Sequence, residues 1–556
     1  MYEIYSDIGL QDWTLAKTLD WRAGLTPDAP FLIFQDGDPI SFSAIRQTAQ
    51  GYASNLKQAG ICAGDRVILL LGNRSEHVAL WFAINLLGAI DVPVNPALSG
   101  KLLEHTLNLV EAKTVIIDAQ LLPALRDIKS SLSHVRQVFT IDADPDHPVS
   151  GFNLEISPLV SHPHAGMESV FSPETRYSDV MSILFTSGTS GPSKGVMLTH
   201  AQAFLTARQT VEGLWVEGHD TFYCAHPLFH MSPRFCVLYA ALLTGAKVHF
   251  DRKFSAPEWI DRIRATEATV TIGHGPLLEM IFSQSERPDD ADTKLSRIGT
   301  SPFPKCIATN FERRFGVKGI ETWGMTEVNI PCWHPKDEPL KPGSCGKVRH
   351  EWYEFQIIDP DTDEVMPQGQ VGEFAIRPKL PGIISPGYFA NPAATVRAWR
   401  NLWFHTGDTG YMDADGWVYF VDRLGDRIRR RAENISSYEI EAIANTFPLI
   451  EESAAVGVPS EYESDDDIKL CVVLRPGSAF SPQDLLAFLA SNLPHYMIPR
   501  YIEVLDELPR TPTKKTRKVD LRIAGVTSRT WDRKAQGIQL KALMDKTRAA
   551  PQDAGV

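Results

Sequence analysis

A run of small hydroxyl and glycine residues around position 190 has the composition of a phosphate-binding loop. An apolar stretch at 183–185 leads into this run, and a second apolar stretch follows it. Glycines let the backbone turn its N–H groups inward, while hydroxyls and one lysine supply further donors to phosphate oxygens. The candidate ligands of a nucleotide triphosphate are Thr186, Ser187, Gly188, Thr189, Ser190, Gly191 and Lys194.

Two alternatives to this interpretation can be weighed from the same residues. The GxxxxGK(S/T) spacing of a Walker A loop fails, because Ser193 rather than glycine precedes Lys194. A flexible linker is the commoner fate of such composition, but apolar segments on both sides and one fixed lysine favour a phosphate site. Thr199 and Gln202 have the spacing of a helix capping box, which predicts a helix start there.

The loop closely resembles the phosphate-binding loop of the adenylate-forming superfamily, which contains acyl-CoA synthetases, peptide-synthetase adenylation domains and beetle luciferases. The resemblance extends over about residues 10–535. Details at 429–431 and 435–437 look closest to carnitine/crotonobetaine-type CoA ligases. The family therefore implies that the chain is an enzyme that activates a carboxylic acid with ATP.

Residues 321–327 are similar to the family's aromatic-Gly-x-Thr-Glu motif. Trp323 offers a flat face for adenine, Thr326 a hydroxyl for the α-phosphate, and Glu327 an oxygen ligand of the kind that Mg²⁺ prefers. The resemblance places these further residues in the ATP site: Thr300, Ser301, Trp323, Gly324, Met325 and Thr326.

Three later positions match family motifs and complete the expected site. Asp408 matches the aspartate that accepts hydrogen bonds from both ribose hydroxyls, which one carboxylate can do. Arg423 is expected at the ribose or phosphate, near a hinge. Lys515 takes the catalytic position, where its charge would stabilise the transition state of adenylation. Taken singly, these segments read as a plain turn and exposed basic segments.

The acid pocket is expected around a segment that ends in an aromatic ring at His230. Arg234 could meet a second carboxylate of the substrate, although such an arginine more often pairs with a local acid. Gly273 and Gly275 leave room for a bulky or ring-containing acid. The expected pocket comprises His230, Met231, Arg234, His274, Gly275, Gly299 and Thr300. The expected catalytic residues are Lys515, Thr326, Glu327 and His230.

The expected thiol tunnel and hinge depart from the family pattern. Gly425 replaces the usual Asp or Lys at the hinge, which widens the accessible backbone range. Ala432 replaces a glycine in a loop that lines the thiol tunnel of relatives, and Lys514 replaces the glycine before Lys515. The full tunnel and hinge set is Gly425, Arg431, Ala432 and Glu433.

The 556 residues exceed what one hydrophobic core usually serves, so at least two domains are expected. Short β-branched runs alternate with helical segments, which indicates an α/β fold. We expect a large N-terminal domain of layered α/β sheets with a β-rich subdomain (1–423), a small mobile α+β domain (424–530) and a polar tail (531–556).

Charge and composition exclude some classes of protein. A net charge of -13 argues against a nucleic-acid partner bound through a basic face. No signal peptide is evident, and the apolar stretch at 78–90 is too short to span a membrane and reads as a buried helix. Seven scattered cysteines without a CxxC pair predict a reduced, cytoplasmic chain.

The sequence thus predicts an ATP-dependent, AMP-forming acyl-CoA synthetase that uses Mg²⁺ and coenzyme A. The expected partners are a small carboxylic acid, ATP and CoA, with a carrier protein as a possible acceptor, in a monomer or homodimer. One alternative is an enzyme that loads a carrier protein or stops at the adenylate. A non-catalytic nucleotide or acyl-CoA binding relative is another.

Overall fold

The computed structural model divides the chain into two compact units. It describes residues 8–142, 155–161, 174–186, 193–305, 307–423, 427–430, 433–462, 465–475, 477, 480–509, 516, 518–540 and 543. Unit 1 comprises Met1–Pro96, Leu107–Phe185 and Gly195–Asp422. Unit 2 comprises Ala97–Thr106, Thr186–Lys194 and Arg423–Val556. Among the described residues, no helix is both long and apolar enough to cross a bilayer.

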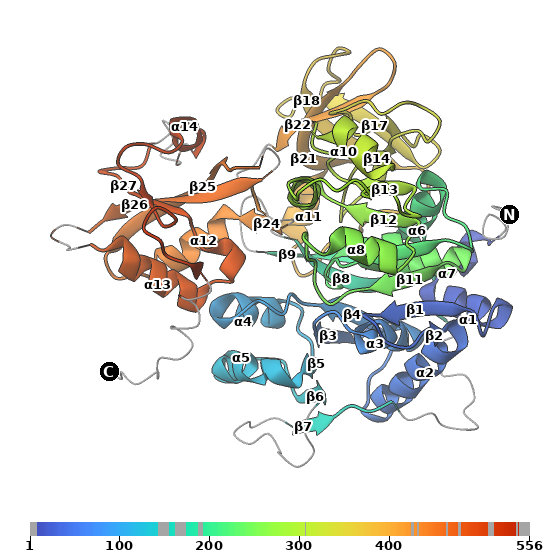
Figure 1. Ribbon diagram of the computed structural model, residues 1–556. Coiled ribbons are helices and arrows are strands. Elements are labelled where there is room, and N and C mark those ends of the chain that lie inside the picture. Colours follow the sequence, from blue (N-terminus) through green and yellow to red (C-terminus); the bar gives the residue numbers. More distant parts are fainter. Residues whose placement is uncertain are drawn as a thin grey trace. The chain divides into compact units, whose positions relative to one another are not determined.

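A nine-stranded sheet forms the centre of unit 1, with the order β16-β15-β14-β13-β12-β10-β11-β1-β2. Its strands β1, β11, β10, β12, β13 and β14 run parallel, and β15, β16 and β2 are antiparallel additions at the two edges. The bounds are β1 Pro30–Phe34, β2 Ile40–Ser41, β10 Thr221–Cys224, β11 Lys247–Phe250, β12 Val270–Gly273, β13 Arg297–Thr300, β14 Lys318–Met325, β15 Asn329–Trp333 and β16 Lys347–Val348. Figure 1 shows β12, β13 and β14 side by side.

A second, eight-stranded sheet has the order β19-β9-β8-β4-β3-β5-β6-β7 and is parallel from β8 to β7. Its bounds are β3 Arg66–Leu70, β4 Ile90–Pro93, β5 Thr114–Asp118, β6 Gln137–Ile141, β7 Glu155–Pro158, β8 Val180–Thr186, β9 Lys194–Thr199 and β19 Gly387–Tyr388. The central strands are continuous apolar runs with both faces buried, as parallel sheets require.

A five-stranded sheet completes unit 1, with the order β17-β18-β21-β20 and β22 paired to β21. Its pairs β17–β18, β18–β21 and β20–β21 are antiparallel. The bounds are β17 Tyr353–Ile358, β18 Gly372–Pro378, β20 Trp399–Arg400, β21 Trp403–Met412 and β22 Val418–Arg423. This sheet is the expected β-rich subdomain of the large domain, and its first strand begins at Tyr353.

The helices follow local sequence signals. Thr199 caps α6 by accepting a hydrogen bond from Gln202 N at 3.0 Å, as the capping-box spacing predicts. The expected buried helix is α3, whose residues from His77 to Leu86 are all buried. The α-helices up to residue 423 are α1 Leu15–Leu25, α2 Phe42–Gln58, α3 Ser75–Leu86, α4 Gly100–Leu109, α5 Leu122–Asp127, α6 His200–Gly213, α7 Ala240–Thr244, α8 Trp259–Ala265, α9 Gly275–Phe282, α10 Ala308–Phe315 and α11 Pro392–Ala398.

The C-terminal part of unit 2 is an α+β fold around a four-stranded sheet ordered β25-β26-β27-β28, with a β23–β24 hairpin. Its bounds are β23 Arg427–Arg430, β24 Glu433–Ser436, α12 Ser437–Ala444, β25 Ile450–Pro459, β26 Asp466–Leu474, α13 Pro482–Asn492, β27 Tyr501–Val504, α14 Lys518–Ala524 and β28 Trp531–Asp532. Strand β28 opens the segment that was expected as a polar tail, and Arg500 Nη2 donates to Asp532 Oδ2 at 3.0 Å. The expected fold class is confirmed.

Candidate active site

The expected site residues of unit 1 follow the ends of four neighbouring parallel strands. His230 lies in the segment after β10, His274 directly follows β12, Thr300 ends β13, and Thr326 directly follows β14. These strands are adjacent in the nine-stranded sheet, in the order β14-β13-β12-β10. In open parallel sheets, ligands bind at the carboxyl edge of the strands. The topology therefore gathers residues separated by about a hundred positions at one edge.

Thr300 lies in the middle of this edge. It pairs in register with Gly273 of β12 and with Glu321 of β14. The hydroxyl of Thr322 donates to the carbonyl of Thr300 at 3.2 Å, and the Thr300 hydroxyl donates to the Pro302 carbonyl at 2.8 Å. The threonine is buried, so its hydroxyl shapes the turn after β13, while Ser301 beside it is exposed.

Trp323 is tied to the aspartate expected at the ribose. Its indole N–H donates to Asp408 Oδ2 at 3.0 Å, and both side chains are buried. The ring also packs edge-on against Phe374, with centroids 5.0 Å apart. The sequence motifs predict both residues but not this bond, which makes Trp323 an orienting partner of Asp408. Its use as an adenine platform stays a prediction.

Glu327 is held by residues that sequence reasoning missed. The Tyr388 hydroxyl donates to Glu327 Oε1 at 3.0 Å, and both side chains are buried. The backbone around the glutamate is also fixed, because the amide of Gln202 donates to the Thr326 carbonyl at 2.8 Å. Ser385 N donates to the Glu327 carbonyl at 2.8 Å. Gln202 was noticed only for its capping spacing, and no local signal marked Tyr388.

The glycine of the Trp-Gly-Met-Thr-Glu motif has a steric reason. Strand β14 turns sharply into β15 and pairs with it antiparallel. A Cβ atom on Gly324 would lie only 2.1 Å from the carbonyl oxygen of Asn329. Only glycine allows this close approach of two backbones.

The four hydrogen-bonded side chains described above form one group. We refer to Trp323, Glu327, Tyr388 and Asp408 as the β14 cluster.

Three histidines form the other part of the edge, and we refer to His226, His230 and His274 as the histidine wall. The rings of His226 and His274 meet edge to face, with centroids 5.3 Å apart. The ring of His230 lies 4.3 Å from that of Phe229. Burial lowers the pKa of His226 to about 4, so this ring is neutral at pH 7.

Asn73 holds the backbone of the histidine wall, another contact that sequence reasoning missed. Its amide donates to the carbonyls of His226 at 3.0 Å and Asp251 at 3.2 Å. Its Oδ1 accepts a hydrogen bond from Leu228 N at 2.8 Å. Asn73 follows strand β3 by only a few positions, so a strand of the second sheet fixes a segment of the first.

Arg234 does not line the expected pocket. It lies in the π-helix η4 (Ser232–Tyr239) and is fully buried. Its guanidinium forms an ion pair with the buried carboxylate of Asp91, donates to Ser182 Oγ at 3.2 Å and lies over the Trp81 ring. The reading in which this arginine pairs with a local acid is therefore the right one, and we remove Arg234 from the pocket residues.

The remaining pocket residues are positioned as follows. Met231 directly precedes η4 and is half-buried, as is His230. Gly275 is the first residue of α9 and is buried, and Gly299 lies in β13 beside Ile272 of β12. These residues share the carboxyl edge with the histidine wall.

Several predicted site residues lie outside the described residues: Ser187, Gly188, Thr189, Ser190, Gly191, Gly425, Arg431, Ala432 and Lys515. Thr186 ends β8 and Lys194 begins β9, so a strand lies on each side of the predicted phosphate loop. Arg423 ends β22 and Glu433 begins β24.

The described residues contain no group of three or more His, Cys, Asp or Glu side chains that could hold a metal ion by themselves. Glu327 is a single buried carboxylate at the end of β14. Mg²⁺ commonly takes one or two protein carboxylates and completes its shell with waters and substrate phosphates. The donor set therefore fits a magnesium ion that arrives with a nucleotide.

Comparison with known proteins agrees with this arrangement. The chain is 31% identical over 524 residues to a crotonobetaine/carnitine–CoA ligase of Salmonella typhi, covering 91% of this chain and 98% of the relative. A ligase of the same name from Salmonella typhimurium is 30% identical over 524 residues, with the same coverage.

Solved structures show the same fold. A double mutant of the o-succinylbenzoate CoA synthetase MenE of Bacillus subtilis superposes with a TM-score of 0.77 at 23% identity, covering 94% of this chain and 99% of that one. The amide bond synthetase McbA of Marinactinospora thermotolerans gives a TM-score of 0.78 at 22% identity, covering 91% of this chain and 99% of that one.

Two family models match successive parts of the chain. The model of the AMP-binding enzyme C-terminal domain matches residues 439–515. The model of the AMP-binding enzyme matches residues 19–389, which is more than half of the chain and includes Trp323 and Glu327. The chain therefore belongs to the AMP-binding enzyme family of adenylate-forming ligases.

Proposed function

We propose that this protein joins a carboxylic acid to coenzyme A in two steps, through an acyl-adenylate made from ATP. The observation that carries the proposal is the buried Asp408 carboxylate, oriented by the Trp323 indole beside the carboxyl edge of the parallel sheet. Membership of the AMP-binding enzyme family and the CoA-ligase names of the relatives support the same conclusion.

Asp408 is suited to the two ribose hydroxyls of ATP. A carboxylate can accept hydrogen bonds on both oxygens, and the Trp323 N–H donates to Oδ2. Burial strengthens hydrogen bonds to a charged group, because water competes less for them. In this proposal Arg423 reaches the ribose or a phosphate, and the loop from Thr186 to Lys194 surrounds the phosphates.

Glu327 would hold the magnesium ion that accompanies ATP. Bound Mg²⁺ neutralises phosphate charge and so makes the α-phosphorus easier to attack. The protein's own contribution is to aim one carboxylate: Tyr388 donates to Oε1 at 3.0 Å, and the Gln202 and Ser385 contacts hold the backbone of 326–327.

In the first step the substrate carboxylate attacks the α-phosphorus of ATP and pyrophosphate leaves. Lys515 and Lys194 would stabilise the negative charge that develops, with the Thr326 hydroxyl on the α-phosphate. In the second step the thiolate of CoA attacks the acyl carbonyl and AMP leaves. We propose that a hinge at Gly425 brings Arg431, Ala432 and Glu433 to the thiol path between the steps.

The acid would bind against the histidine wall. His226 is neutral at pH 7, because burial lowers its pKa to about 4, and it therefore brings no positive charge to the acid. Gly275, the first residue of α9, carries no side chain and in this proposal leaves room for a bulky or ring-containing acid. Gly273 does not leave room as expected, because a Cβ atom there would lie only 2.8 Å from Leu278 Cδ2. We place the reaction in the cytoplasm, where ATP and CoA are available, with a monomer or homodimer as the active form.

A pyrophosphate-release screen tests the proposal. Short, long, aromatic, steroid-like and dicarboxylic acids are offered with Mg-ATP, with and without CoA, and acyl-AMP, acyl-CoA and acylated carrier protein are identified by mass spectrometry. We expect CoA-dependent acyl-CoA formation with at least one class. Carrier loading alone, or acyl-AMP that persists in the presence of CoA, would contradict the second step.

Lys515→Ala separates the two steps. Loss of a charge that stabilises the transition state lowers adenylation by about a hundredfold or more. Thioester formation from supplied acyl-AMP should continue at close to the wild-type rate, because that step does not use the lysine. Equal loss of both activities would contradict the assigned role.

A further inference from the structure

The strand that carries Asp408 contains a bulge directly at the aspartate. Strands β18 and β21 pair with Glu373 opposite Thr409 and with Ala375 opposite His405. Between these pairs, Phe374 alone lies opposite Thr406, Gly407 and Asp408. A bulge interrupts the strand ladder and re-aims a side chain, and bulges are frequent beside active sites. The direction of the Asp408 carboxylate therefore depends on what holds this bulge in shape.

The Glu373 side chain closes the bulge from the neighbouring strand. Its Oε1 accepts a hydrogen bond from Gly407 N at 2.8 Å. Gly407 has a φ of +72°, a left-handed conformation that turns its N–H out of the ladder. The Thr406 hydroxyl supports the same turn, since it donates to the Phe374 carbonyl at 2.8 Å and accepts from Asp408 N at 3.1 Å.

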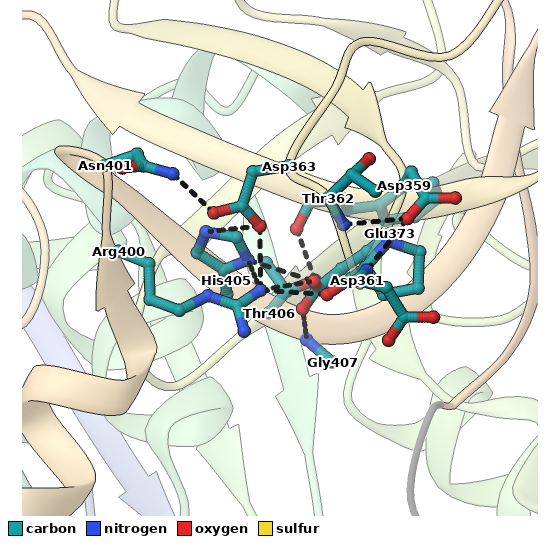
Figure 2. A network of polar contacts seen from close by, with 12 residues as sticks. Asp359, Asp361, Thr362, Asp363, Glu373, Arg400, Asn401, His405, Thr406 and Gly407 are labelled. Atoms are coloured by element: carbon teal, nitrogen blue, oxygen red, sulfur yellow. Dashed lines mark hydrogen bonds and ion pairs between the residues drawn. The ribbon is translucent and has the colours of Figure 1, made fainter.

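The second oxygen of Glu373 belongs to a chain of polar contacts. Figure 2 shows His405 and Arg400 next to the glutamate, with Asp363 beyond them. His405 Nδ1 lies 3.0 Å from Glu373 Oε2 and 2.9 Å from Arg400 Nη2. Arg400 Nη2 also donates to Asp363 Oδ1 at 2.9 Å. Glu373 is 3% exposed and His405 9%, so neither side chain can swing into solvent without breaking these contacts.

We propose that Glu373 is a positioning residue for Asp408: its carboxylate fixes the bulge that aims the Asp408 carboxylate at the ribose of ATP. The inference rests on the proposed role of Asp408. A hydrogen bond from a backbone N–H to an ionised, buried carboxylate is stronger than a neutral one. Glu373 thus acts through Gly407 on the residue that follows it, while Trp323 in β14 of the nine-stranded sheet also holds the aspartate.

The competing explanation is that Glu373 only stabilises the β18–β21 pair. A purely structural loss would weaken every nucleotide alike. A positioning role predicts a loss confined to nucleotides with ribose hydroxyls. ATP and 2′,3′-dideoxy-ATP distinguish the two, and their binding can be measured by calorimetry without knowing the acid substrate.

We expect the wild type to bind ATP more tightly than dideoxy-ATP. Glu373→Ala should weaken ATP binding about tenfold and dideoxy-ATP binding less than about threefold. Asp408→Ala should remove the preference, and the double variant should show no further loss, because Glu373 acts through Asp408. Glu354→Ala is the matched control. Glu354 pairs with Arg377 across β17 and β18 of the same sheet, and its loss should leave both affinities unchanged.

Equal weakening of both nucleotides in Glu373→Ala, or a retained wild-type preference, overturns the inference. A wild type that does not distinguish the nucleotides overturns the role of Asp408 itself, before any variant is compared. If Glu373→Ala does not fold, Gly407→Ala tests the same bulge. The added Cβ would clash with nothing, but the left-handed φ of +72° at this position is unfavourable for alanine, so the bulge should change shape. That variant should lose the preference, and Glu373→Gln, which keeps an acceptor for Gly407 N–H, should retain most of it.

Discussion

The histidine wall and the Trp323 and Glu327 side chains of the β14 cluster lie on or just after strands of the same sheet, but the two regions are held in place differently. In the β14 cluster, side chains fix one another: Trp323 donates to Asp408, and Tyr388 donates to Glu327. In the histidine wall, His226 Nε2 lies 3.2 Å from the Ile272 carbonyl, the rings contact other rings, and Asn73 holds the backbone. The β14 cluster is therefore fixed by bonds between its own side chains, whereas the histidine wall is fixed by bonds to and from the backbone and by ring contacts. Under the proposed function, the nucleotide-binding region should tolerate fewer substitutions than the acid-binding region.

Burial removes the charge of one titratable group in or next to each region. It raises the pKa of Glu321, on the strand that carries Trp323, to about 8, and it lowers the pKa of His226 to about 4. Both groups are therefore uncharged at pH 7. Away from this edge, the buried Arg234 and Asp91 form an ion pair.

Breaking the Arg234–Asp91 pair should have the largest effect, and on stability rather than on acid choice. Arg234→Met leaves the Asp91 carboxylate buried without its cation, which costs about 3–5 kcal/mol of unfolding free energy. Urea unfolding measures the loss. Arg234→Met combined with Asp91→Leu should recover most of it. A change in acid preference without loss of stability would return Arg234 to the pocket.

Asp408→Ala tests the nucleotide end. The proposed function gives this carboxylate two charge-assisted hydrogen bonds to ribose, so ATP affinity should fall about a hundredfold when they are lost. Isothermal titration with Mg-ATP gives the value. His274→Ala serves as the control from the other region and should bind ATP as the wild type does. An equal loss of ATP affinity in both variants would contradict the assignment of ATP to the β14 cluster and of the acid to the histidine wall.

The raised pKa of Glu321 gives a pH signature to the β14 strand. An unfolded glutamate loses its proton near pH 4.5, but the folded one retains it to about pH 8, so rising pH between these values destabilises the fold. Glu321→Gln cannot titrate. From pH 5 to pH 6.5 the variant should gain about 2 kcal/mol over the wild type in unfolding free energy. If the difference in unfolding free energy between the variant and the wild type does not change with pH, the raised pKa of Glu321 is contradicted.

His274→Ala should have the smallest effect, confined to the acid. Removing one ring enlarges the space beside His226, so bulkier acids should gain about fivefold in kcat/KM over smaller ones. The KM for ATP should stay within about twofold of the wild type. Competition between two acids of different size in one reaction measures the ratio. An unchanged ratio would place the acid away from the histidine wall.

Much of the fold and site follows from local patterns in the sequence. The β-branched runs and helical segments predict the parallel α/β layers, the Thr199–Gln202 spacing predicts the start of α6, and the apolar stretch at 78–90 predicts a buried helix. Motif matches also predict Thr300, Trp323 and Glu327 as site residues, and the structure places them at or near the ends of β13 and β14. Each of these predictions depends on residues within a few positions of one another, so their interactions follow from sequence spacing alone.

Only the tertiary structure decided which distant residues became partners. Arg234 lies 143 positions from Asp91, yet the two form a buried ion pair. Arg234 is therefore not one of the pocket residues. Trp323 and Asp408, 85 positions apart, and Glu373 and Gly407, 34 apart, meet because strands from different parts of the chain are brought together. Residue type shows that a group needs a partner when buried, but strand order and register decide which partner it finds.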